Sequence, residues 1–241
     1  LLNLWKEELW PYNCKALWVS RFAPRKKLAG LFKLNNELPK LLGNEDANTL
    51  LSNLRGSSEL ESLGPVIGIS KIIKGESSRE EYLMKYGHRG PHEFELSIPD
   101  PAENKIWLEK QIEEFTKSNV DAEGLLKKQH TQYERTLKKL EERFPDKSKK
   151  IRKQIADASK GSYIREATRS EWTRVFRVNR VFALKAGELT GIGEDVFFLY
   201  MDEVLNFLSG DISAVQHIPD RRKTFEKYKA LPPLPSIIRG K

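Results

Sequence analysis

The chain has 241 residues, enough for one large or two small domains with a hydrophobic core. Hydrophobic residues make up 39% and charged residues 32%, which excludes collagen-like and disulfide-stapled proteins. The longest uncharged apolar run, Val196 to Met201, is far too short for a membrane helix. The single cysteine, Cys14, cannot form an internal disulfide and excludes metal sites built on cysteine pairs. We therefore expect a soluble, cytoplasmic protein with no membrane partner.

The net charge of +8 comes from 42 Lys and Arg against 34 Asp and Glu, and such an excess could attract nucleic acid. Acidic residues are nevertheless interleaved with basic ones, and the most basic tract, 147–153, is short. Solvated helix faces with ion pairs four residues apart give this pattern without any ligand. We therefore favour solvated helix faces and expect no nucleic-acid partner. The alternative interpretation is a self-contained basic module that binds an anionic partner such as nucleic acid.

Apolar residues recur at helical spacing along the chain, and almost none alternate with polar residues as in a strand, so the pattern predicts an all-α fold. Two early helices should be parted around Pro24. Further helices are expected at 44–54, 60–74, 77–86, 104–118, 122–144, 148–189 and 201–208, with a brief extended stretch at 196–199 and a last helix from Asp220. The segment 148–189 is either one long helix or two helices broken near Gly161.

This pattern predicts a multi-helix bundle with a long central helix and an ordered loop at 87–101, where glycine and proline stop the preceding helix. We expect one helical module, residues 1–241, with possible sub-bundles at 1–86 and 102–231. Residues 232–241 are expected to be a proline-rich exit linker. An amphipathic pattern already begins at Leu1, which suggests a module cut from a longer chain.

The loop at 87–101 carries the densest chemistry, with His88, Arg89, His92, Glu93 and Glu95 within eight residues. Such a set can bind an anion, bind a metal or transfer a proton. The two histidines have the spacing of zinc ligands on a helix, but the glycine and proline between them disfavour that helix, so we expect no metal. A tight turn that bonds to neighbouring helix ends and a ligand-binding loop remain equal alternatives.

The second such segment is 165–180, where arginines recur on the expected long helix. Residues 175–184 are apolar on nearly all sides, which predicts burial of this stretch. Buried arginines need a carboxylate or phosphate partner, and we expect at least one of Glu93 and Glu95 to pair with this helix. The candidate site residues are His88, Arg89, Glu93, Glu95, Arg165, Arg169, Arg174, Arg177 and Arg180. They form a substrate-binding site or a structural ion-pair network, of which the network is favoured, and no residue is assigned a catalytic role.

Three runs together carry a resemblance to a known family: Lys85 to Glu93, Arg165 to Glu171, and Leu189 to Leu199 followed by Asp202 and Glu203. In order and spacing they resemble the central helical region of dikinases similar to phosphoenolpyruvate synthase and rifampicin phosphotransferase. The resemblance covers most of the chain and is densest from Ser78 to Gly240.

The resemblance implies a longer parent enzyme, with an ATP-grasp domain before this region and a phosphohistidine domain after it. The parent would use ATP and magnesium to pass a phosphoryl group through that histidine to pyruvate or another hydroxylated acceptor. None of His88, His92, His130 and His217 lies in a context like the phosphocarrier motif, and no glycine-rich nucleotide loop is present. The resemblance therefore implies a non-catalytic module without its own cofactor. Its expected partners are the flanking domains and a small-molecule acceptor, because in rifampicin phosphotransferases this region forms the acceptor-binding surface.

Overall fold

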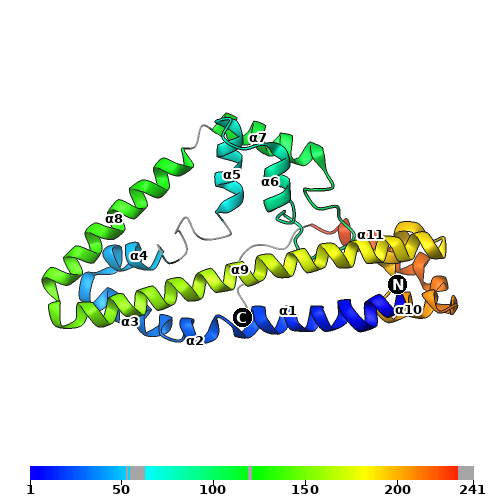
Figure 1. Ribbon diagram of the computed structural model, residues 1–241, viewed down its shortest axis with the longest axis horizontal. Coiled ribbons are helices and arrows are strands. Elements are labelled where there is room, and N and C mark those ends of the chain that lie inside the picture. The colour runs from blue at the N-terminus through cyan, green and yellow to red at the C-terminus, as the bar shows by residue number, and fades with distance from the viewer. Residues whose placement is uncertain (53, 55–62, 119–120, 233–241) are drawn as a thin grey trace. The chain divides into compact units, whose positions relative to one another are not determined.

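The computed structural model describes residues 1–52, 54, 63–118 and 121–232. Within these ranges every regular element is a helix, so the prediction of an all-α fold with a long helix is confirmed (Figure 1). The elements are η1 (Leu4–Leu9), α1 (Trp10–Phe22), α2 (Arg25–Leu28), α3 (Leu31–Leu42), α4 (Asn44–Ser52), α5 (Gly64–Ile73), α6 (Arg79–Tyr86), α7 (Lys105–Ser118), α8 (Ala122–Arg143), α9 (Pro145–Thr190), η2 (Gly193–Phe198), α10 (Met201–Leu208), η3 (Ser213–His217) and α11 (Ile218–Lys229). In these same ranges, no helix has both the length and the apolar character needed to cross a membrane.

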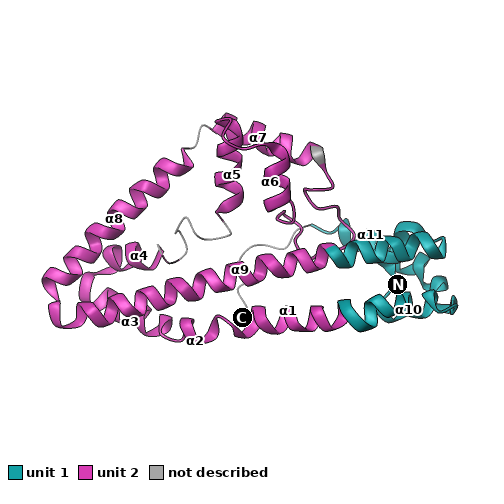
Figure 2. Cartoon of the chain, viewed as in Figure 1, with its two compact units in different colours: residues 1–9, 178–241 teal, residues 10–177 magenta. Residues whose placement is uncertain are grey.

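The helices gather into two compact units, drawn in teal and magenta in Figure 2. Unit 1 comprises residues 1–9 and 178–241, and unit 2 comprises residues 10–177, so α9 runs through both. These boundaries differ from those of the possible sub-bundles 1–86 and 102–231, which stay a prediction. The expected exit linker lies outside the described residues, apart from Pro232.

The main core of unit 2 forms where α3, α4, α8 and α9 meet, because each helix buries one apolar face. Its buried members are Leu34, Leu38, Leu42, Ala47, Leu50, Leu54, Leu137, Leu140, Ile151, Ile155 and Ala158. Gly43 has φ +82°, a conformation that favours glycine, and it turns the chain from α3 into α4. Pro145 likewise starts α9 directly after α8, in the first-turn position that proline tolerates.

A second core of unit 2 joins α5, α6 and α7 through Ile69, Ile72, Tyr82 and Leu108. The expected start of α6 at Ser77 or Ser78 is resolved by a reciprocal cap. Ser78 Oγ accepts from the Glu81 amide at 3.1 Å, and Glu81 Oε2 accepts from the Ser78 amide at 2.9 Å. Such a cap satisfies amides that the first helical turn leaves without partners, so it fixes where α6 begins.

The long helix α9 is one continuous helix of 46 residues, so the alternative of a break near Gly161 is wrong. Glycine at this position lets α2 pack closely against α9, because a Cβ here would lie 2.9 Å from Leu28 Cγ and 3.0 Å from Lys27 Cβ. Lys27 Nζ also lies 2.6 Å from Asp157 Oδ1, one turn earlier on α9. Gly161 and Asp157 therefore hold the short helix α2 against α9.

The core of unit 1 is built around Trp5 and Phe182, whose ring centroids lie 5.0 Å apart. Ala183, Ala186, Val196 and Val204 complete its buried set. Two arginines fasten α11 to this unit. Arg221 Nη1 and Nη2 donate to the two oxygens of Glu203 at 2.5 and 2.8 Å, which lowers the pKa of Glu203 to about 2. Arg222 pairs with Asp195. The third resemblance run, 189–203, therefore anchors α11 through its carboxylates.

Some expected boundaries are wrong. Residues 196–198 are not extended, since Gly193–Phe198 forms a 3-10 helix, and of the expected stretch only Leu199 has extended backbone. The last helix begins at Ile218, because proline is accommodated in its first turn. The start of the helix expected at 60–74 lies outside the described residues, and its described part begins at Gly64.

The Gly161 contact yields a test of the packing between α2 and α9. Gly161→Leu should lower the free energy of unfolding by about 1–3 kcal/mol, the usual cost of overpacking, although leucine has the higher helix propensity. Urea denaturation of the variant checks this. Ala156→Leu, on an exposed position of the same helix, is the control and should not destabilise. Equal stabilities of both variants would contradict the close packing of α2.

Candidate functional site

The loop between α6 and α7 is closed at its base. The Ala102 amide donates to the Gly87 carbonyl at 3.1 Å, and a Cβ on Gly87 would lie 2.6 Å from the Cβ of Ala102. Asp100 Oδ1 accepts from the amides of Ala102 and Glu103 at 3.0 and 3.2 Å. Glycine at 87 therefore permits a close approach that no larger residue allows, and the two ends of the loop are tied together.

Side chains of this loop contact one face of α9. His88 Nε2 lies 2.8 Å from Ser170 Oγ, and Arg177 Nε lies 3.3 Å from Asp100 Oδ2. Between these points Arg174 Nη2 donates to the Lys85 carbonyl at 3.3 Å. Residues 170, 174 and 177 lie one above the other on a helix, so the loop follows a single stripe of α9.

Glu93 is the central ion-pair residue of this contact. Its Oε2 accepts from Arg169 Nη2 at 3.0 Å, and its Oε1 lies 3.0 Å from Arg89 Nε. Only 10% of the Glu93 side chain and 11% of the Arg89 side chain are exposed. The Arg89 N–H groups are poorly directed at the carboxylate, since buried Nε and Nη1 have no hydrogen-bond partner in the described structure. Glu93 is thus one carboxylate shared by two guanidinium groups.

His88 is buried beside these arginines. Burial lowers the pKa of His88 to about 3, and the positive charges of Arg174, Arg89 and Arg177 add to this effect. The imidazole is therefore neutral at physiological pH, and one ring nitrogen is engaged by the hydroxyl of Ser170. A neutral, buried imidazole here contributes a hydrogen bond between the loop and α9, and it does not act as a general acid.

Phe94, next to Glu93, has φ +71°, which is uncommon for a residue with a bulky side chain. Its ring packs on two aromatic residues of α9, with centroids 5.1 Å from Trp172 and 5.0 Å from Phe176. Strained backbone of this kind persists only where the surroundings hold it in place. The Glu93 ion pairs and this aromatic cluster supply that constraint, and together they position Phe94 beside α9.

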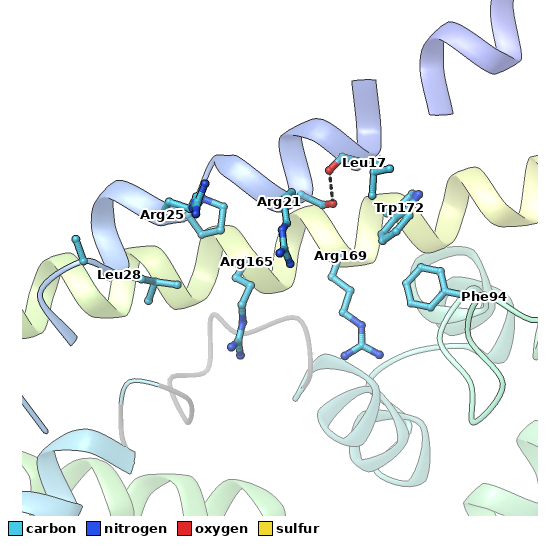
Figure 3. Close-up of a pocket in the computed structure, with 11 residues that line it drawn as sticks. Leu17, Arg21, Arg25, Leu28, Phe94, Arg165, Arg169 and Trp172 are labelled. Carbon is cyan, nitrogen blue, oxygen red and sulfur yellow. Dashed lines mark hydrogen bonds between the residues drawn. The ribbon is translucent and has the colours of Figure 1, made fainter. Parts of the chain in front are cut away.

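A pocket of about 760 Å³ opens beside Phe94, between α9 and the α1–α2 segment of unit 2 (Figure 3). It is lined by Leu17, Ser20, Arg21, Pro24, Arg25, Leu28, Ala29, Phe94, Arg165, Arg169 and Trp172. In Figure 3, Phe94 and Trp172 lie at one end of the pocket and Leu28 at the other, with Arg21 between them. The pocket thus combines an aromatic wall with several guanidinium groups.

The expected pairing of the loop with the long helix is present through Glu93. Glu95 does not take part: it is exposed and accepts from the amide and hydroxyl of Ser97 at 2.9 and 2.7 Å. The two glutamates therefore differ in their partners: Glu93 bonds to α9, whereas Glu95 bonds within the loop. Arg165 pairs with its neighbour Glu166 at 3.0 Å.

The expected burial of the arginines is only partly right. Arg180 is buried, belongs to unit 1 and lies with its guanidinium carbon 5.3 Å from the ring centroid of Phe197. Arg174 and Arg177, by contrast, are 37% and 41% exposed. The stretch 175–184 is not buried all round, since Val178 and Val181 are exposed. A helix of this length exposes one side in spite of its apolar composition.

Several members of the site were not predicted from the sequence. Asp100 was overlooked as a partner for Arg177, although its position between two prolines before a helix is typical of a capping carboxylate. The pair Trp172 and Phe176, four residues apart, also signalled an aromatic face. Arg21 and Arg25 carried no signal, since only the tertiary fold places them around the same pocket as Phe94.

No family model, curated protein or solved structure matches this chain. The resemblance of the three sequence runs and the geometry of the site are therefore the observations that bear on its function.

The double role of Glu93 leads to a stability test. Glu93→Ala should cost about 3 kcal/mol of unfolding free energy, because it leaves the buried Arg89 without its carboxylate. Glu95→Ala and Glu113→Ala, both at exposed positions, should cost less than about 0.5 kcal/mol. Chemical denaturation of the three variants measures the difference. Similar small losses at all three positions would contradict the docking of the loop through Glu93.

The pKa of His88 leads to a pH test. Its folded pKa of about 3 lies below the ordinary value of 6.5, so below pH 6.5 the unfolded chain binds a proton that the folded chain does not. Stability should therefore fall as pH decreases from 6.5 toward 4, with unfolding linked to uptake of about one proton by this residue. His88→Gln should remove this component from urea titrations at several pH values. An identical pH dependence in both proteins would show that His88 does not supply it.

Proposed function

We propose that this chain is a non-catalytic helical module of an ATP-dependent phosphotransferase that resembles phosphoenolpyruvate synthase or rifampicin phosphotransferase. In this role it binds the phosphoryl acceptor and carries no nucleotide or phosphohistidine chemistry of its own. ATP and magnesium would act in the parent protein, at the flanking ATP-grasp and phosphohistidine domains. The parent protein as a whole would be the enzyme.

The observation that carries this proposal is the contact between two of the resemblance runs. Residues 85–93 and 165–171 lie 72 or more positions apart in sequence, yet Glu93 pairs with Arg169 and His88 meets Ser170. Two of the three runs that carry the resemblance thus contact each other within unit 2. This supports a shared purpose for both runs, because separate surface motifs would not need to meet.

The position of the pocket also supports an acceptor-binding role. Arg165 and Arg169 come from one run, and Phe94 directly follows the other, and all of them line the pocket. A concave site with aromatic walls and a few polar groups is the usual form of a small-molecule site. The docked loop then serves as one wall of the acceptor site.

The reading frame that encodes the chain tests the proposal. Extended in both directions, it should encode an ATP-grasp domain upstream and a phosphohistidine domain downstream. Stop codons close to both ends of residues 1–241, with neither domain encoded, would overturn the proposal.

A biochemical measurement tests the non-catalytic assignment separately. The purified chain, incubated with ATP and magnesium, should neither release phosphate from ATP nor gain acid-labile phosphate. Stoichiometric acid-labile phosphate on any of His88, His92, His130 or His217 would contradict the assignment.

A further inference from the structure

The pocket beside Phe94 carries an excess of positive charge. Arginine accounts for four of its lining residues, and none of the lining residues is acidic. Guanidinium groups gathered around a concave surface favour a carboxylate or phosphate, which they can bind through paired N–H groups.

The carboxylates nearby pair with only two of these four arginines. Arg169 shares Glu93 with Arg89, and Arg165 pairs with Glu166. Arg21 has no ion pair anywhere in the described part of the chain. Arg25 contacts only the ring of Phe22 in that part, with its guanidinium carbon 5.3 Å from the centroid. Arg21 and Arg25 therefore line the pocket from exposed positions, and no carboxylate of the described residues pairs with either of them.

The other end of the pocket is aromatic. Phe94 and Trp172 form the wall, and both remain partly exposed. Leu17 and Leu28 extend the apolar lining along α1 and α2. Figure 3 shows Phe94 beside Trp172, with the side chains of Arg165 and Arg169 extending parallel to each other from α9, away from the α1–α2 segment in this view. A flat ring can pack on this wall while a charged group on the same molecule reaches the arginines.

We propose that this pocket binds a small anionic molecule with an aromatic body, its carboxylate held by Arg21 and Arg25 and its ring packed on Phe94 and Trp172. A volume of about 760 Å³ lies within the usual range of small-molecule sites. The role of this molecule as phosphoryl acceptor rests on the proposed function and requires that it also carry a hydroxyl group. The ligand class itself rests only on the lining of the pocket.

Calorimetry with two probes of the same ring tests this site. The probes are 6-hydroxy-2-naphthoate and 2-naphthol, and the second is the first without its carboxylate. The chain should bind the naphthoate about tenfold or more tightly than the naphthol, as charge-assisted hydrogen bonds to a carboxylate permit.

Two double variants assign this preference to the pocket. Arg21→Gln with Arg25→Gln should reduce the preference for the naphthoate to less than about threefold. Lys149→Gln with Lys150→Gln removes the same charge from exposed positions of α9 outside the pocket and should leave the preference unchanged. Thermal unfolding of both variants confirms that each is folded, as their surface positions lead us to expect.

Several results would overturn the inference. Equal affinity for both probes would show that the pocket has no anion site. Equal loss in the two double variants would show general attraction by net charge. Failure of the naphthoate to bind at millimolar concentration would remove the ligand class altogether.

The outcomes for the ligand and for the proposed function are separable. The calorimetry uses neither nucleotide nor phosphoryl transfer. Binding in a chain whose reading frame lacks the flanking domains would keep the site and end its acceptor role. A reading frame with both domains, but no preference for the naphthoate, would keep the proposed function and end this ligand class.

Discussion

The Glu93 carboxylate, shared between Arg89 and Arg169, is the interaction on which the site depends. A carboxylate this buried is stable only as long as cations compensate for the water it has lost. Arg89 comes from the same loop, and Arg169 comes from α9, so the one charge joins the two elements. Without it, the loop would keep its closed base at Gly87 but would lose its central attachment to the long helix.

This attachment explains the strained backbone next to it. Phe94 holds a left-handed φ because Glu93 is fixed on one side and its own ring is fixed between Trp172 and Phe176 on the other. The strain costs roughly 1–3 kcal/mol, which surrounding contacts must offset. In return, an aromatic ring stands at the edge of the pocket in a defined orientation. Packing and electrostatics thus cooperate to build one wall of a binding surface.

The same arginines explain why the network and the binding site are not exclusive alternatives. Arg169 uses its guanidinium group both to dock the loop and to line the pocket. Because Glu93 already serves Arg89, the positive charge on the pocket side is not cancelled. His88, in the same loop, remains uncharged, so it adds no further positive charge beside these arginines. The structural ion pairs therefore set the charge that a ligand would meet.

The sequence by itself determined the helical class, the position of most helices and the residues of the loop and the long helix. These follow from local physics: the spacing of apolar residues and the stops made by glycine and proline. Even the pairing of a loop glutamate with α9 followed from the cost of a buried charge. Only the tertiary structure decided which glutamate it was, that α9 continues through Gly161, and that Asp100, Arg21 and Arg25 join the site. Those residues are distant in the chain, and contacts between distant residues depend on how helices pack, which no local pattern encodes.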